Sequence, residues 1–420
     1  MDIKRYGSLS FLLAAGCMAS LTPAQLLAGG YKIPENSINS TALSAAYIAN
    51  AHGADASYFN PAAMVFDEGG SAFEVNATYI HLPSIKYTDM NGLLPSDESE
   101  REHFLVPSFH YVGDMMGNAR FGLSVVTPAG LTKRWRVTGK AASEEFTLKT
   151  IEVNPSIAYK FNDMFSAAIG GRVIYSNGDV RSNAAPLGSS AQRDLGGSSY
   201  DFGYNLALHF KPTDELALAL TYRSKIDLTV EGNAELPAGP FSYSGYAEVE
   251  VPVPGALNLA AAYTFNNKTT VELVYERTYW SAYKELDFNY DSTLHPALAA
   301  FDTPVPKNWS DTNTYRIGVT HKLDNRWTLM AGFAYDKTPT PKSTAGFELP
   351  DSDARIYSIG ARYQYTDNLN IGFGLLYDHK ETLRIEPSDG NTGSPFPAYN
   401  NAKFEDSGAL LLTMGAQYTF

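Results

Sequence analysis

The sequence predicts an all-β protein, a 14-stranded antiparallel transmembrane β-barrel with an N-terminal hatch (a plug) in its lumen. Three observations support this prediction. Short segments alternate apolar and polar residues, six short turns alternate with seven long connections, and the chain ends on an aromatic residue, Phe420. Alternating segments of about ten residues, separated by turns, are typical of outer-membrane barrels.

The clearest strand is the last one, residues 409–420. Counting back in twos from Phe420 gives only apolar or aromatic residues, namely Tyr418, Ala416, Met414, Leu412 and Leu410. The residues between them are mainly small or polar. Successive side chains of a strand point to opposite faces, so one face suits lipid and the other suits a polar lumen. We also expect the barrel-assembly machinery to read the aromatic C-terminus.

The turns and loops give the number of strands. Short turns are predicted near 114–118, 162–163, 212–215, 266–268, 324–326 and 366–368. Long connections are predicted near 83–102, 128–146, 178–199, 231–246, 289–313, 336–354 and 386–403. Such barrels have short periplasmic turns and longer extracellular loops. Both termini are therefore predicted on the periplasmic side of a Gram-negative outer membrane.

Residues 1–28 are predicted to be a secretory signal peptide that is cleaved after Ala28. Lys4 and Arg5 precede an apolar stretch, as in signal peptides. The only cysteine, Cys17, lies in this segment, and lipidation at Cys17 is the less favoured alternative. The net charge of −13 and the lack of basic runs argue against nucleic acid as a partner.

Residues 29–70 are predicted to form the hatch, and residues 71–420 to form the barrel. The first segment does not alternate, is rich in small and polar residues, and is too short to bury a core of its own. A barrel of fourteen strands encloses a wider lumen than an eight-stranded one, which its own side chains fill. The hatch is expected to occupy part of that lumen.

Several motifs in order along the chain resemble the FadL / toluene-xylene transporter family of outer-membrane proteins. Asn60-Pro61-Ala62 resembles the NPA motif of the family's hatch, and Gly29-Gly30-Tyr31 resembles the start of the mature family chain. Further similar stretches are residues 121–131, 153–159, 221–225, 280–286 and 349–353.

The resemblance implies transport of hydrophobic compounds, with long-chain fatty acids as the first candidate. The alternative substrates are small aromatic or aliphatic hydrocarbons such as toluene. Ligand would be captured at the extracellular loops, enter an apolar pocket near Gly29, Gly30 and Tyr31, and leave sideways after the hatch with Asn60, Pro61 and Ala62 rearranges. Outer-membrane lipid and lipopolysaccharide are the expected surroundings, and a monomer is the expected state.

In the family, an inward kink of the third strand supplies the lateral exit. That strand corresponds to about residues 120–127 of this chain, so Thr127 and Pro128 are the candidate position of the kink. Proline removes a donor from the strand ladder. The alternative is that Pro128 simply begins the following loop.

Four cations are predicted to face the lumen and are candidates for holding a carboxylate head group: Arg172, Arg223, Arg316 and Arg362. The alternative is a balanced network that braces the hatch, because buried charges need partners. Trp280, Trp309 and Trp327 are expected in the aromatic girdles at the membrane interfaces.

An enzyme and a general porin are the competing classes. The eight histidines form no recognisable Ser/His or Asp/His constellation, and no HExxH metal motif occurs. No catalytic residue, no metal and no cofactor is therefore predicted. The hatch argues against a porin, because open diffusion does not need a plug in the lumen.

Overall fold

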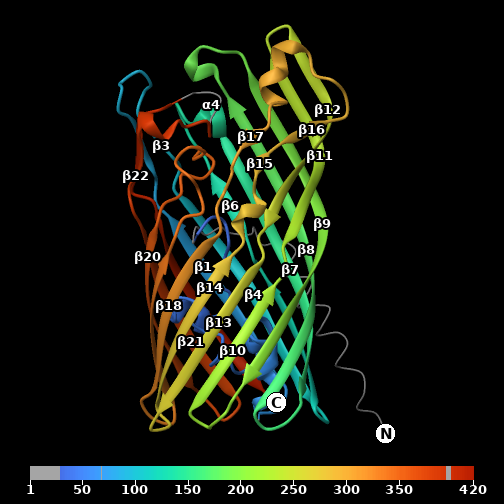
Figure 1. Cartoon of the computed structure of the whole chain (residues 1–420), viewed down its shortest axis with the longest axis vertical. Coiled ribbons are helices and arrows are strands. Elements are labelled where there is room, and N and C mark those ends of the chain that lie inside the picture. Colours follow the sequence, from blue (N-terminus) through green and yellow to red (C-terminus); the bar gives the residue numbers. More distant parts are fainter. Residues whose placement is uncertain (1–28, 68, 394–398) are drawn as a thin grey trace.

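The computed structural model describes residues 29–67, 69–393 and 399–420. The predicted signal peptide, with Cys17, lies outside these residues. The described chain forms a tall, closed barrel of antiparallel strands, with a small amount of helix inside it and at one end (Figure 1). Among the described residues, no helix has the length and apolar composition needed to cross a membrane.

Fourteen strands make the wall, as the turns and loops predicted. Three of them are broken by two or three residues, so each counts as two elements: β5 (Ala119–Val126) with β6 (Gly130–Lys133), β10 (Leu216–Arg223) with β11 (Ile226–Ala238), and β12 (Phe241–Val253) with β13 (Ala256–Phe265).

The eleven other wall strands are continuous: β1 (Ala72–Leu82), β4 (Glu102–Met116), β7 (Glu145–Lys160), β8 (Phe165–Asn183), β9 (Gln192–Phe210), β14 (Thr269–Thr278), β18 (Thr312–Lys322), β19 (Trp327–Asp336), β20 (Ala354–Gln364), β21 (Leu369–Lys380) and β24 (Gly408–Thr419). Strand β1 pairs with both β4 and β24, which closes the barrel.

The two ends of the barrel differ. All six predicted short turns lie at one end, called the turn end here, and the seven other connections lie at the other, the loop end (Figure 1). Two connections predicted to be long, near 178–199 and 231–246, are shorter, because the strands continue beyond the expected wall and leave only residues 184–191 and 239–240 between them. The loop end carries additional small elements: β2 (Lys86–Asp89), β3 (Asp97–Glu98), α4 (Lys140–Ser143), η2 (Ala185–Leu187), η3 (Trp280–Ala282), β15 (Glu285–Leu286), β16 (Phe288–Tyr290), η4 (Pro296–Phe301), β17 (Val305–Pro306), β22 (Leu383–Ile385), η5 (Pro387–Asp389) and β23 (Ala402–Glu405).

The outer face of the wall is apolar. In β24, Leu410, Met414 and Tyr418 are exposed, whereas Leu411 and Thr413 between them are fully buried. Other wall strands also expose large apolar side chains, such as Phe202 in β9. This alternation, confirmed by the structure, leaves an outer surface suited to hydrocarbon rather than water.

Residues 29–67, called the inner segment, lie inside the barrel (Figure 1). The segment contains α2 (Ile38–Ala42), α3 (Ala56–Phe59) and η1 (Pro61–Phe66). Its hydroxyl groups form hydrogen bonds of 2.8 Å with hydroxyl groups of wall strands around the lumen: Thr41 with Thr413, Ser44 with Ser358 and Ser57 with Ser124. The hatch boundaries at residues 28/29 and 70/71 stay predictions.

Close packing between the inner segment and the wall depends on glycines in the wall strands. A Cβ built on Gly332 would lie 2.2 Å from the backbone of Leu43, and one built on Gly360 would lie 2.4 Å from the Cβ of Ala42. Any larger residue at Gly332 would have to displace backbone. The inner segment therefore approaches β19 and β20 at backbone distance, which only glycine permits.

Arg120 in β5 anchors the end of the inner segment near the turn end. Its guanidinium donates hydrogen bonds of 2.7 to 2.8 Å to five backbone carbonyl oxygens, those of Met64, Asp67, Gly69, Gly70 and Gly113. An arginine side chain has five N–H donors, so all of them are used.

We expect Arg120→Ala to lower the free energy of unfolding by about 3 kcal/mol or more, because five carbonyl oxygens, among them those of the buried Met64 and Gly113, lose a charged donor. Arg120→Lys is expected to recover only part of this loss, since an ammonium has three donors in no fixed plane. Urea unfolding of the barrel refolded in lipid would measure both variants. Equal stability of Arg120→Ala and the unmodified chain would contradict this role.

Candidate functional site

The barrel wall is interrupted between β4 and the strand beside it. The ladder between them ends with the pair Phe109–Val125 and resumes with the pair Ser99–Trp135. Between these pairs, residues 101–108 form no ladder with β5 or β6. The register is the same on both sides of the interruption, so the strands separate and rejoin rather than slip. We call this interruption the wall gap.

The strand beside the wall gap contains a bulge. Residues 127–129 separate β5 from β6 and lie opposite two residues of β7, because Val126 pairs with Glu152 and Gly130 pairs with Lys149. A bulge bends its strand and frees backbone groups from the ladder. The bulge includes Thr127 and Pro128, and their role as a lateral exit stays a prediction.

The inner segment bonds to the backbone groups freed by the bulge. Lys32 and Ala129 form a short antiparallel bridge flanked by two backbone hydrogen bonds of 2.9 Å. Asn36 adds further contacts on both sides of the wall gap. Its Oδ1 accepts from the backbone N–H of Thr127 (3.2 Å), and its carbonyl oxygen accepts from the hydroxyl of Ser108 (2.7 Å). The inner segment thus replaces the missing pairing from inside.

Ion pairs close the loop-end rim of the wall gap. Arg134 donates from Nε and Nη2 to the carboxylate of Glu102, at 2.9 and 2.5 Å. Beside it, Arg136 donates two hydrogen bonds of 2.6 Å to Glu100. These bonds hold the pKa of Glu100 below its usual range. The wall is therefore joined on the loop side of the gap, which extends over residues 101–108.

A small pocket lies inside the barrel against the bulge. It is lined by Lys32 and Pro34 of the inner segment, Pro61 of η1, Pro128 of the bulge, and several wall residues. Its volume of about 70 Å³ is less than half of the roughly 150 Å³ of a cavity that binds benzene. A long hydrocarbon chain cannot fit unless the inner segment moves.

Two of the predicted cations face this pocket and share one carboxylate. Arg172 donates a hydrogen bond of 2.9 Å to the carboxylate of Glu152, and Arg223 is also hydrogen-bonded to Glu152. The Arg223 guanidinium lies 4.2 Å from the ring centroid of Tyr58, close enough for a cation–π contact. Arg172 also donates to the carbonyl of Ser224 (2.6 Å).

The third predicted cation at the pocket, Arg316, belongs to a second ion-pair group. Glu276 accepts from Lys32 at 2.7 Å and from Arg316 at 3.4 Å. Arg316 also donates to the carbonyl of Ser44 (3.0 Å). The sequence did not single out Lys32, which follows the predicted hatch start and carries no motif of its own.

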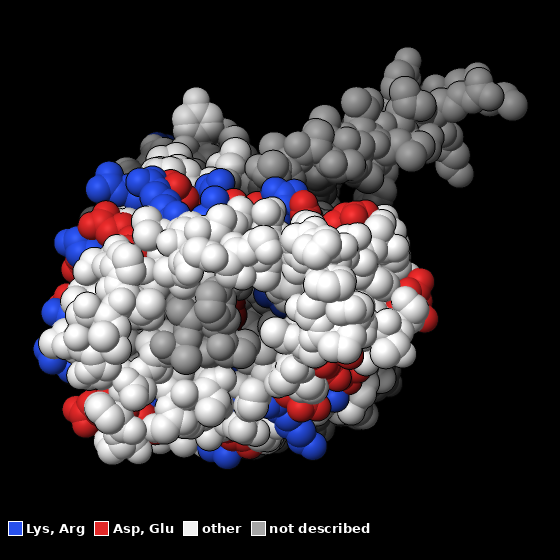
Figure 2. Space-filling model, turned by 90° about the horizontal axis from the view of Figure 1, so that it is seen from above, with Lys and Arg blue, Asp and Glu red and all other residues white. Residues whose placement is uncertain are grey.

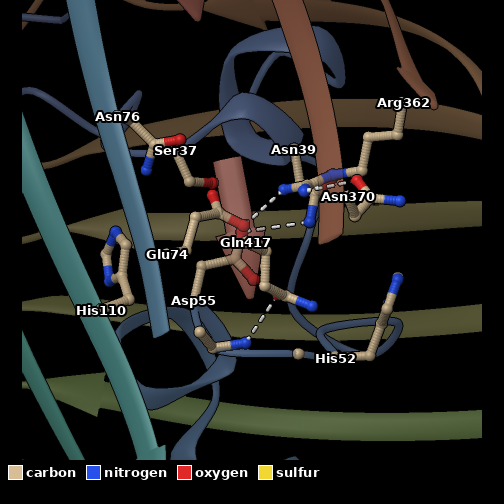
Figure 3. A network of polar contacts seen from close by, with 12 residues as sticks. Ser37, Asn39, His52, Asp55, Glu74, Asn76, His110, Arg362, Asn370 and Gln417 are labelled. Carbon is tan, nitrogen blue, oxygen red and sulfur yellow. Dashed lines mark hydrogen bonds and ion pairs between the residues drawn. The ribbon is translucent and has the colours of Figure 1, made fainter. Parts of the chain in front are cut away.

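The fourth predicted cation, Arg362, lies elsewhere, in a polar network towards the turn end (Figure 3). Its guanidinium donates hydrogen bonds of 2.7 Å to the carboxylate of Glu74 and to Oδ1 of Asn39. Asn39 in turn donates to Asp55 (3.0 Å). Arg362 therefore ties α2 to the wall and does not line the pocket that the other three arginines share.

Tyr31 fills an apolar region above the pocket. Its ring packs at 4.8 Å from Trp280, 5.7 Å from Trp309 and 6.1 Å from Tyr283, measured between centroids. Its hydroxyl donates to the carbonyl of Pro252 (2.5 Å). Gly29 and Gly30 lie beside it, where a Cβ on Gly30 would be 2.5 Å from the Trp280 ring.

The expected girdle position of Trp280 and Trp309 is wrong. Both are nearly fully buried, with exposed fractions of 1% and 5%, whereas Trp327 is 41% exposed on the wall. The two buried indoles belong to η3 and to the connection before β18, which fold back into the lumen. No residue pattern indicates this position, because a tryptophan in a loop has the same sequence context whether the loop folds into the lumen or away from it.

The Asn60-Pro61-Ala62 motif links the inner segment to the wall. Asn60 donates to the carbonyl of Ile48 (2.9 Å) and lies 3.2 Å from Nδ1 of His209. Pro61 begins η1, and the carbonyl of Ala62 accepts from the hydroxyl of Ser166 (2.6 Å). The Oδ1 of Asn60 is buried without a hydrogen-bond partner among the described residues.

Glu272 of β14 anchors the middle of the inner segment. Its carboxylate accepts from three successive backbone N–H groups, those of Ile48 (2.7 Å), Ala49 (2.6 Å) and Asn50 (3.2 Å). The side chain is fully buried. Among the described residues, no three His, Cys, Asp or Glu side chains are grouped so that they could hold a metal ion.

We expect Glu272→Ala to increase the ion conductance of the barrel in planar bilayers. Each N–H left unsatisfied costs about 1–3 kcal/mol, so residues 48–50 should detach from the wall and open an aqueous path. Glu272→Gln should increase conductance less, because its amide oxygen still accepts. Conductance of Glu272→Ala equal to that of the unmodified chain would contradict this anchoring role.

Sequence comparison places the chain among known proteins. A family described as "Outer membrane protein transport protein (OMPP1/FadL/TodX)" matches residues 19–420. The chain is 26% identical over 377 residues to a "Long-chain fatty acid transport protein" of Salmonella typhi, covering 78% of this chain and 81% of that protein. It is 24% identical over 426 residues to the protein of that name from Escherichia coli K12, covering 89% and 92%.

Structural comparison finds the same architecture in solved proteins. A FadL homologue from Pseudomonas aeruginosa superposes with a TM-score of 0.80 at 21% identity, covering 93% of this chain and 100% of that one. The toluene transporter TodX of P. putida superposes with a TM-score of 0.70 at 16% identity, covering 91% and 98%. At these identities the likeness concerns the fold.

Proposed function

The chain belongs to the OMPP1/FadL/TodX family of outer-membrane transport proteins, and from this premise we propose that it carries hydrophobic compounds across the outer membrane, with long-chain fatty acids as the first candidate. Two relatives named for long-chain fatty acid transport support this choice, each aligned over most of its length. The loop end then faces outward and both termini lie on the periplasmic side, as is usual for such barrels.

The wall gap carries the proposal. A hydrophobic solute gains about 0.8 kcal/mol for each CH₂ removed from water, so a long chain is better transferred into lipid than into an aqueous periplasm. A gap over residues 101–108 offers a sideways route into the bilayer. The inner segment, bonded to the bulge through Lys32 and Ala129, closes this route from inside.

Ligand binding and opening of the wall gap are coupled through one short stretch. Tyr31 fills the apolar region above the pocket, and its neighbour Lys32 bonds to the bulge. Because the pocket has a volume of only about 70 Å³, a ligand must displace residues 31–36. Displacement of Tyr31 pulls on the bridge at Ala129 and so frees the wall gap.

Neutral hydrocarbons such as toluene are the second candidate substrate. One observation favours them: the three arginines at the pocket already have carboxylate partners, Arg172 and Arg223 in Glu152 and Arg316 in Glu276. A neutral ligand would leave these pairs intact. A fatty acid would have to compete for one of the cations with its head group.

Uptake of labelled oleate tests the proposal. Cells that lack their own fatty-acid transporter would express this chain, with toluene as competitor. Saturable oleate uptake that toluene does not reduce would establish a fatty-acid transporter. Absence of oleate uptake, from a chain shown to be folded in the outer membrane, together with toluene uptake would select the second candidate. Uptake of neither would overturn the proposed function.

A further inference from the structure

Four carboxylates gather inside the barrel beside the start of the inner segment. Asp336 ends β19, Asp378 lies in β21 and Asp351 precedes β20, whereas Glu35 belongs to the inner segment. The electrostatic neighbours of Glu35 include Asp336 and Asp378, and those of Asp378 include Asp336 and Asp351. We call these four residues the acidic cluster.

Cations balance only part of the acidic cluster. Lys380 donates to Asp351 over a distance of 2.5 Å. Arg316, the other cation close to Glu35, belongs to the ion-pair group at the pocket. Both carboxylate oxygens of Glu35 and both of Asp378 are buried without a hydrogen-bond partner among the described residues. Buried charges in proteins are normally paired, so the acidic cluster lacks a positive charge.

The acidic cluster is also closed to the medium. Seen from the loop end, charged side chains gather at the rim and uncharged residues cover most of the middle (Figure 2). Within the cluster, no residue is more than 4% exposed. These observations favour a compensating charge that belongs to the chain itself.

The start of the inner segment lies against the acidic cluster. A Cβ built on Gly29 would be 2.7 Å from Oδ2 and 2.9 Å from Oδ1 of Asp336, so the backbone of Gly29 packs against that carboxylate. The next residue, Gly30, donates its backbone N–H to Oδ2 of Asp351 (3.3 Å). If the chain is cleaved after Ala28, as the sequence predicts, Gly29 carries a free α-amino group. Such a group is mostly protonated at neutral pH.

We propose that the α-ammonium group of Gly29, created by removal of residues 1–28, binds the carboxylate of Asp336 and is the missing cation of the acidic cluster. Hydrolysis of the Ala28–Gly29 peptide bond consumes one water and leaves a carboxylate on the released peptide and the ammonium on Gly29. The peptide N–H that Gly29 has in the precursor carries no net charge. Only the processed chain therefore neutralises the cluster.

Docking of the new terminus fastens the inner segment on a second side. Gly29 precedes by three residues Lys32, which bridges to Ala129 in the bulge. The ammonium joins the same short stretch to Asp336 at the end of β19. Removal of residues 1–28 thus completes the closure of the wall gap from inside, whichever compound is carried.

Mass spectrometry of the barrel purified from outer membranes tests the first step. The expected mass is that of residues 29–420 with a free amino group. Any other first residue, or a chain that retains Cys17, would overturn the proposal.

Removal of the ammonium charge tests the docking. Transamination with pyridoxal phosphate, applied to the unfolded chain, replaces the α-amino group of an N-terminal glycine by a carbonyl group. Treated and untreated chains would be refolded in lipid and unfolded in urea. We expect the treatment to lower the folding equilibrium constant about tenfold or more, the equivalent of about 1.4 kcal/mol, because the acidic cluster loses its cation.

Three substitutions separate docking from an unspecific effect of the treatment. In Asp336→Asn the treatment should cost much less, because the ammonium has already lost its partner. In the treated barrel, Asp378→Asn should restore stability, since it removes one charge that has no cation. Asp302→Asn is the matched control, because Asp302 is exposed at the loop end and forms no ion pair among the described residues. The treatment should cost this control as much as the unmodified chain.

Two results would overturn the docking. One is a treatment effect of equal size in the unmodified chain and in Asp336→Asn. The other is a treated barrel as stable as the untreated one, which would mean that protons keep Glu35 and Asp378 neutral instead. Should Asp336→Asn fail to refold, the rescue by Asp378→Asn decides alone. Because the measurement is unfolding of the barrel, its outcome is independent of the proposed function.

Discussion

Uptake should fall to background when a disulfide joins residues 32 and 129, and should return when that disulfide is reduced. Lys32 and Ala129 form a non-hydrogen-bonded antiparallel pair, in which Cα atoms are about 4.5 Å apart. That separation lies within the range that disulfides span. Lys32→Cys with Ala129→Cys would therefore lock the inner segment to the bulge, and ligand could no longer free the wall gap.

The same double variant provides its own control. Labelled oleate uptake would be measured in oxidised cells and again after a thiol reductant, with each single cysteine variant alongside. Lys32→Cys alone also removes the 2.7 Å ion pair to Glu276, so its effect must be subtracted. Oxidised cells that take up oleate as fast as reduced cells would show that the bridge does not open during transport.

Deletion of Pro128 should also abolish uptake while leaving the barrel folded. Residues 127–129 are three residues opposite two of β7, so removal of one leaves β5 and β6 in a single register. Without the bulge, the strand can lie beside residues 101–108 of β4 and close the wall gap, although the pair Ser99–Trp135 must then shift by one residue. We expect loss of oleate uptake to background, measured in cells with equal amounts of folded barrel.

Pro128→Ala is the matched control for the deletion. It keeps the number of residues and hence the bulge, and it keeps the carbonyl of residue 128 that accepts from the inner segment. Uptake should therefore persist in Pro128→Ala. A folded deletion variant that still transports oleate would place the exit somewhere other than the wall gap.

The wall was predictable from the sequence because lipid imposes a strict pattern on it. Alternation such as that of Leu410, Met414 and Tyr418 must be kept along every strand, since a slip of one residue would turn polar side chains into lipid. Turn residues such as Pro212 and Asn266 then mark the strand ends. Fourteen strands follow from these two signals alone.

The interior was less predictable because it depends on which residues meet across the lumen. The sequence placed Arg172 and Arg362 on the same inner face, yet they lie in separate groups with Glu152 and Glu74. Strand phase fixes the side of the wall but not the height along it at which an inner residue docks. Contacts such as Lys32 with Ala129 depend on the path of the inner segment, which has no periodicity.

Photochemical labelling of the exit route tests the central claim most directly. A long-chain fatty acid with a diazirine at its tail would be supplied to cells during transport, and adducts would be mapped by mass spectrometry. Lateral exit predicts adducts on both edges of the wall gap, residues 101–108 and 130–133, that disappear when residues 32 and 129 are locked by a disulfide. Adducts confined to residues at the turn end, such as His52, would contradict it and indicate passage along the barrel axis.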